Sequence, residues 1–144
     1  MILVMDSGET ASTPAMDAAT RQRCFREGRE LFHARRFFDC HEVWEDLWRQ
    51  SAGPEKQLLQ GLIQAAVGGH HWQRGNPVGA RRVWERSLRN LRAAAPLLGL
   101  EPAVHEVQIG LETCLQLAEG TEMPRLHLVL ETLTSGAASG LPDS

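Results

Sequence analysis

The chain has 144 residues, a mass of 16.0 kDa and a formal net charge of −3, with 42% hydrophobic and 23% charged residues. This length suffices for one domain of ordinary size and excludes two. The composition is too apolar for a disordered chain and not basic enough for a nucleic-acid coat protein, so nucleic acid is not an expected partner. No apolar run reaches the roughly 18 residues of a membrane span, and the apolar start at Met1–Met5 lacks the basic leader and the length of a secretion signal. We therefore expect a cytoplasmic protein with no membrane partner.

Small and polar residues dominate both ends of the chain, and they lack the side chains that offset ordering entropy. We expect a flexible N-terminal segment over residues 1–13, a single helical domain over 14–131 and a flexible tail over 132–144. Three cysteines are far apart and form no Cys-x-x-Cys pair, which favours small buried hydrophobes over a disulfide framework or a thiolate zinc site. They are Cys24, Cys40 and Cys114.

Within the domain, apolar residues recur at helical spacing. The first expected helix runs to about His33. The second follows Asp39, which can serve as its N-cap, with Glu42 three residues later as the capping-box partner. The third follows Gly53-Pro54 and runs to about Arg74.

Turn residues predict two further helices. Asn76 can cap a fourth helix that Pro77 opens, since proline suits the first helical position. A fifth helix begins near Pro102 and ends near Gly120, a residue suited to the left-handed helix stop. Leucines then alternate with other residues over 126–130, which fits either a short extended segment or a last helical turn.

The chain contains an internal repeat with a shift of about 40 residues. The shift places Gly28 on Gly68 and Trp44 on Trp84, so the first four helices form two similar hairpins. We therefore expect an all-α fold, a compact five-helix bundle built from two tandem helical hairpins plus a closing C-terminal helix.

Two polar groups on otherwise apolar helices are the candidates for chemistry. His41 and Glu45 lie one helical turn apart and can grip one metal ion, in a spacing that resembles the zinc-peptidase His-Glu-x-x-His signature with glutamate in place of the second histidine. Glu42 is also explained by capping, and His41 by a hydrogen bond at a packing seam. On the third helix Gln60, Gln64 and His71 project to one side, while His70 projects differently. This row faces either water or the His41–Glu45 pair, because buried amides and imidazoles need hydrogen-bond partners.

Charge is distributed unevenly over the last two expected helices. The fourth is rich in arginine, with Arg81, Arg82, Arg86, Arg89 and Arg92. The fifth and its exit are acidic, with Glu101, Glu106, Glu112, Glu119 and Glu122. Because no aromatic residues lie among those arginines, complementary packing or plain solvation is favoured over nucleic-acid binding.

The polar motifs also carry a family resemblance. They are Phe37-Phe38-Asp39-Cys40-His41-Glu42-Val43-Trp44-Glu45-Asp46-Leu47-Trp48-Arg49, Leu59-Gln60-Gly61-Leu62-Ile63-Gln64-Ala65-Ala66, His70-His71 and Gly75-Asn76-Pro77-Val78-Gly79-Ala80. Over about residues 22 to 95 the chain resembles the family known as domain of unknown function 309. The resemblance implies a small all-helical bundle and a label of predicted metal-dependent hydrolase, without an established reaction. The family's motif residues fall here on His41, Glu42, Glu45, Trp48, Gln60, Gly61, Gln64, His71, Gly75, Asn76, Gly79 and Ala80.

Two functions are compatible with these residues. The favoured one is a structural or interaction module that self-associates as a homodimer, with His41, Glu45, Gln60, Gln64 and His71 forming a satisfied polar seam. Its preferred interface is the leucine-rich segment Arg125–Leu130. The alternative is a metal-dependent hydrolase that holds a divalent metal such as zinc on His41, Glu45 and His70 or His71, with Glu42 as general base. No cofactor is established and the small-molecule substrate is unknown.

Overall fold

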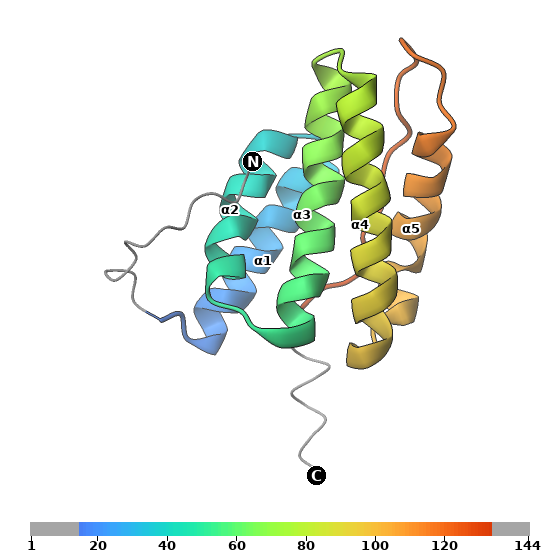
Figure 1. The fold of residues 1–144 in the computed structure, drawn as a ribbon. Coiled ribbons are helices and arrows are strands. Elements are labelled where there is room, and N and C mark those ends of the chain that lie inside the picture. Colours follow the sequence, from blue (N-terminus) through green and yellow to red (C-terminus); the bar gives the residue numbers. More distant parts are fainter. Residues whose placement is uncertain (1–14, 134–144) are drawn as a thin grey trace.

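The computed structural model describes residues 15–133, and these residues form five helices and no strand. The expected flexible segment at 1–13, and all but the first two residues of the expected tail at 132–144, lie outside the described residues. The helices are α1 (Ala18–His33), α2 (Phe37–Arg49), α3 (Gly53–Gln73), α4 (Pro77–Leu98) and α5 (Glu101–Leu115). The all-α bundle predicted from the sequence is confirmed. Along the chain each helix packs against the next, and α3 lies between α2 and α4 (Figure 1).

Local signals explain most helix boundaries. The end of α1 at His33 and the start of α3 at Gly53 lie where the sequence predicts them. Asn76 caps α4, because its Oδ1 accepts a hydrogen bond from the backbone N–H of Gly79 at 3.0 Å. Pro77 then opens the helix at a position that needs no backbone donor.

The start of α2 and the end of α5 differ from the prediction. Helix α2 begins at Phe37, and the N-cap is Arg36, which makes no side-chain capping bond. Asp39 is therefore not the cap but a first-turn residue, whose carboxylate pairs with Arg36 at 2.6 Å. The burial of Phe37 fixes this earlier start. Helix α5 ends at Leu115 and not near Gly120, which lies in the following turn with φ of +86°.

The two hairpins repeat one packing unit. In the first, the indole of Trp44 lies against Gly28 of α1 and donates to the carbonyl of Phe25 at 3.2 Å. In the second, Trp84 lies against Gly68 of α3 and donates to the carbonyl of Ala65 at 3.2 Å. Both indoles are fully buried. Glycine is required at both seats, because a Cβ there would lie 2.1 or 2.3 Å from the indole nitrogen.

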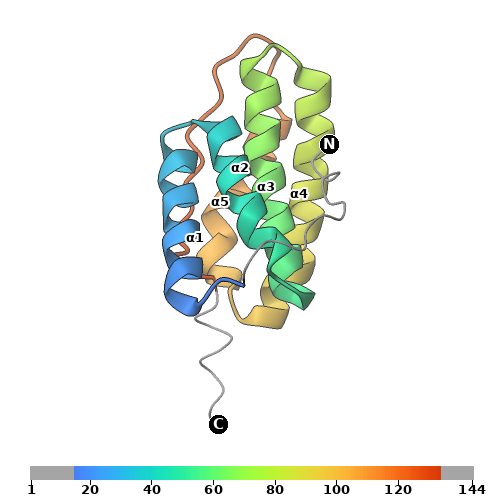
Figure 2. The same ribbon diagram turned by 90° about the vertical axis from the view of Figure 1, so that its left-hand side faces the viewer.

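After α5 the chain turns back and runs in extended form beside α1 and α5 (Figure 2). We call residues 121–133 the strap. Its buried residues alternate with exposed ones and join the core. They are Met123, Leu126, Leu128, Leu130 and Leu133. Of the two conformations left open by the sequence, the extended one is correct.

The strap leaves its leucines unavailable for the interface that the sequence suggested. Leu126, Leu128 and Leu130 are each at most 5% exposed, because α1, α5 and the rest of the core already cover them. The preference for Arg125–Leu130 as a self-association surface is therefore wrong. Among the larger apolar side chains of this segment, Val129 is exposed.

Candidate functional site

The outer side of α2 carries the first candidate pair. His41 and Glu45 lie one turn apart, with 3.7 Å between His41 Nε2 and a Glu45 carboxylate oxygen. His41 Nδ1 lies 2.9 Å from the carbonyl oxygen of Phe38 and donates to it, since a carbonyl only accepts. In the neutral ring, Nε2 then carries the lone pair and faces the carboxylate. The lone pair of Nε2 and the carboxylate oxygen then face each other as two acceptors. A proton on either atom, or one cation between them, removes this repulsion.

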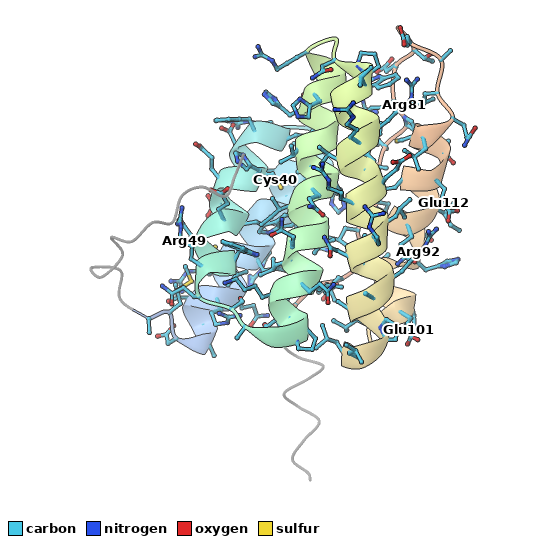
Figure 3. All side chains as sticks on the ribbon, in the orientation of Figure 1. Cys40, Arg49, Arg81, Arg92, Glu101 and Glu112 are labelled. Carbon is cyan, nitrogen blue, oxygen red and sulfur yellow. The ribbon has the colours of Figure 1, made fainter. Side chains whose placement is uncertain are left out.

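Glu45 is one of three side chains in residues 15–133 with a buried polar atom that lacks a hydrogen-bond partner. Its side chain is only 12% exposed, and the atom without a partner is Oε2. The other oxygen lies 3.7 Å from Arg49, a residue labelled on α2 in Figure 3. Burial raises the pKa of the Glu45 carboxyl, while His41 and Arg49 act in the opposite direction. A buried acceptor without a partner is costly, and a donor or cation supplied from outside would satisfy it.

Helix α3 adds His70 to this pair through an aromatic contact. The ring of Phe38 lies 5.1 Å from that of His41 and 5.3 Å from that of His70, measured between ring centroids. Burial, and then the charges of Arg74, His71 and His41, lower the pKa of His70. We call Phe38, His41, Glu45 and His70 the α2–α3 corner. The sequence pointed to three of its members, but Phe38 was not among the candidate site residues.

The remaining predicted site residues lie elsewhere. Gln64 accepts a hydrogen bond from Asn90 of α4 at 2.8 Å, and His71 Nδ1 lies 3.4 Å from the side-chain amide of Asn76 in the turn before α4. Gln60 is half-buried on α3, and Glu42 is exposed. Of the expected row, Gln64 and His71 are bonded toward α4 and its turn, and His70, which was expected to project differently, is the histidine that contacts Phe38 of α2. Any role in binding or catalysis stays a prediction for all of these residues.

Metal binding at the corner has an incomplete set of ligands. His41 and Glu45 offer two donors. Within residues 15–133 there is no group of three or more His, Cys, Asp or Glu side chains arranged to hold a metal ion. Structural and catalytic zinc sites use at least three protein ligands, so these side chains do not fit a complete catalytic zinc centre as they stand.

Two of the five arginines of α4 named above bind to α5 or to the segment that follows it. Arg92 pairs with Glu112 across the α4–α5 contact, where both are labelled in Figure 3. Arg81 donates to the carbonyl of Leu117 at 2.7 Å and lies 3.8 Å from Glu119. The predicted complementary packing is confirmed for these two arginines. Arg82, Arg86 and Arg89 are exposed.

A cavity of about 560 Å³ opens between the α3–α4 turn and the start of the strap. Its lining includes Arg35, Trp72, Thr121 and Glu122. The sequence singled out Glu122 only as part of the acidic exit of the fifth helix and did not group these residues into one site. Trp72 Nε1 donates to the Thr121 carbonyl at 2.7 Å, and Arg35 lies 3.6 Å from Glu122. Residues so far apart along the chain give no common local signal, which is why the sequence did not reveal this cavity.

Comparison with known proteins connects the first hairpin and α3 to a family. The model of the family described as "Domain of unknown function (DUF309)" matches residues 25–83. The resemblance to this family is confirmed. The match contains the whole α2–α3 corner, whereas α5 and the strap lie outside it. The family carries no assigned activity in that description.

One curated relative comes from Bacillus subtilis (strain 168) and is described as "Uncharacterized protein YpuF". It is 40% identical over 75 residues, which cover 49% of this chain and 43% of the relative. The match therefore spans less than half the length of that relative. As for membranes, none of the helices in residues 15–133 combines the length and the apolar character needed to span one.

Proposed function

We propose that this chain is an interaction module that self-associates through the α2–α3 corner. The observation that carries the proposal is Phe38, which is 48% exposed although it lies in ring contact with two histidines. Aromatic residues flanked by polar and arginine side chains are typical of the centre of protein interfaces. Arg36 and Arg49 supply such a rim on the same helix and its cap.

A second copy of the chain is the partner to which we commit. In a twofold pair the same patch occurs on both copies, so each Phe38 ring would be covered by the partner's corner. The partner would also supply a donor to the buried Glu45 Oε2, which has no hydrogen-bond donor within residues 15–133. Because the strap leucines are covered within their own chain, the corner replaces them as the proposed interface.

Light scattering at a protein concentration near a tenth of a millimolar tests this proposal. We expect the mass of a dimer for the natural chain and of a monomer for Phe38→Glu, because a charge there would be buried without a partner. Leu97→Glu is the matched control, since Leu97 is a 70% exposed apolar residue on α4 away from the corner. A natural chain that is monomeric, or a dimer that survives Phe38→Glu, would overturn the proposal. Thermal melting of both variants checks that they fold.

A metal-dependent hydrolase is the second candidate, and one observation favours it. A cation between His41 Nε2 and the unpartnered Glu45 oxygen would satisfy both atoms. His70 lies on the other side of Phe38 as a candidate third donor, but its ring has to move to join them. Zinc content of the purified protein, compared with that of His41→Ala, tests this candidate. Stoichiometric zinc that disappears in the variant supports it, and zinc-free natural protein after growth with added zinc contradicts it.

A further inference from the structure

The strap is held on α1 by side chains rather than by a sheet or a helix of its own. Arg35 donates to the carbonyl of Met123 at 2.6 Å, and Arg125 of the strap donates to the carbonyl of His33 at 3.0 Å. Arg29 lies 3.4 Å from the carbonyl of Leu128. Each of these bonds joins residues about ninety positions apart, so they form only when the strap lies against α1 and the turn after it.

A fourth bond between the strap and α1 depends on the protonation state of a histidine. The backbone N–H of Leu128 donates to Nε2 of His33, with 3.0 Å between the two nitrogens. A backbone N–H can only donate, so Nε2 must carry a lone pair and the proton of the neutral ring resides on Nδ1. A protonated imidazole has two donors and no acceptor. Protonation of His33 therefore eliminates this bond and leaves two N–H groups facing each other.

The surroundings of the ring make its protonated form still less favourable. The His127 ring stacks on that of His33, with 5.2 Å between centroids and an angle of 13°. The other charged groups that act on it are Arg29 of its own helix and Arg125 of the strap. Burial first, and then these three groups, lower the pKa of His33 from its ordinary value of 6.5. Beyond the ring, Arg35 in the next turn faces Glu122 at the start of the strap.

We propose that His33 is a proton-sensitive latch, which holds the strap closed while its ring is neutral and favours release of the strap when the ring is protonated. Release would uncover the strap leucines together with the part of the core that they cover. The device is independent of the proposed dimer, because the α2–α3 corner involves neither His33 nor the strap.

The direction of the pH effect follows from the geometry. With the strap open, His33 is solvated and titrates near 6.5, whereas the closed state resists protonation. The open state therefore binds more protons as the pH falls below about 6.5, and the closed state loses stability there. Above that pH both states hold a neutral ring, so the equilibrium does not change.

Hydrogen exchange of the full chain between pH 7.5 and 5.5 tests the latch. We expect the protection factors of residues 126–130, referred to a free peptide of the same sequence, to fall by at most about tenfold, which is the limit for a ring that titrates near 6.5 in the open state and stays neutral in the closed state. In His33→Gln, whose amide oxygen can accept the Leu128 bond without titrating, protection should stay constant over this range. His105→Gln removes an exposed histidine on α5 and serves as the control that keeps the fall.

Nuclear magnetic resonance provides a readout that holds even if His33→Gln opens the strap at every pH. In the natural chain, the Leu128 amide shift should follow the same titration midpoint as the His33 ring, below the ordinary histidine pKa of 6.5. Constant protection of residues 126–130 in the natural chain would overturn the proposal. An equal fall in His33→Gln, or a Leu128 amide that does not follow His33, would do so as well.

Discussion

The two hairpins share one internal design and differ on their outer faces. Inside, each places a tryptophan of the second helix on a glycine of the first, and each indole donates to a carbonyl 19 residues earlier at 3.2 Å. The supporting aromatic also repeats, since Phe32 lies 5.8 Å from Trp44 and Trp72 lies 5.8 Å from Trp84 between ring centroids. Both hairpins therefore bury their tryptophan with the same glycine contact, the same hydrogen bond and a neighbouring aromatic ring.

The outer faces show where this symmetry ends. Glu45 is half-buried and lies beside His41, whereas its repeat counterpart Glu85 is exposed and has Arg81 in the place of the histidine. The turns differ as well, because Arg35 has a φ of 64° where the second hairpin has Gly75 with a φ of 79°. Left-handed backbone is unfavourable for a residue with a side chain. Arg35 adopts it while clamping the strap, a task that the glycine does not have.

The comparison separates packing from candidate function. Features present in both hairpins stabilise the core. Features present in only one hairpin are the α2–α3 corner and the bond from Arg35 to the strap. Three predictions test this division. Two compare a residue of one hairpin with its repeat counterpart in the other, and the third compares the starts of α2 and α4.

The largest effect is expected from the two buried tryptophans. Trp44→Ala and Trp84→Ala should each lower the free energy of unfolding by roughly 3–5 kcal/mol, because each removes a fully buried ring and leaves a cavity. Denaturant melts of the two variants measure this. A loss confined to one variant would show that the two units are not equivalent in energy.

A smaller loss is expected at the glycine seats. Gly28→Ala and Gly68→Ala should each cost about 1–3 kcal/mol, since the new Cβ would overlap a rigid indole that is packed on all sides. Gly110→Ala is the control, because its Cβ would meet chiefly one terminal methyl of Leu126. Equal stability of all three variants in thermal melts would contradict the proposed seats.

The smallest effect distinguishes the two helix starts. Asn76→Ala should cost about 0.5–2 kcal/mol, because it removes the cap of α4. Asp39→Ala should cost less than about 0.5 kcal/mol, because Asp39 lies inside α2 and loses only an exposed ion pair with Arg36. Chemical denaturation that ranks the two in the opposite order would restore Asp39 as the cap.

The candidate site was only partly predictable. The His41–Glu45 pair follows from helical spacing, because residues four apart always share a face. The choice between His70 and His71 did not follow, since it depends on which side of α3 meets α2. The structure places His70 beside Phe38 and His71 beside Asn76. Phe38 was missed as an exposed group, because an aromatic residue next to a helix start is equally consistent with packing.

The sequence by itself determined the helices and the 40-residue repeat, which relates Gly28 to Gly68 and Trp44 to Trp84, while the packing of each tryptophan on its glycine came from the tertiary structure. Periodicity, caps and prolines act within a few residues, so they can be recognised without knowing what packs where. Only the tertiary structure decided the course of the strap, the earlier start of α2 and the partners of Gln64 and His71. These depend on contacts between distant segments, such as the bond from Leu128 to His33, and burial and hydrogen bonding at such contacts outweigh weak local preferences.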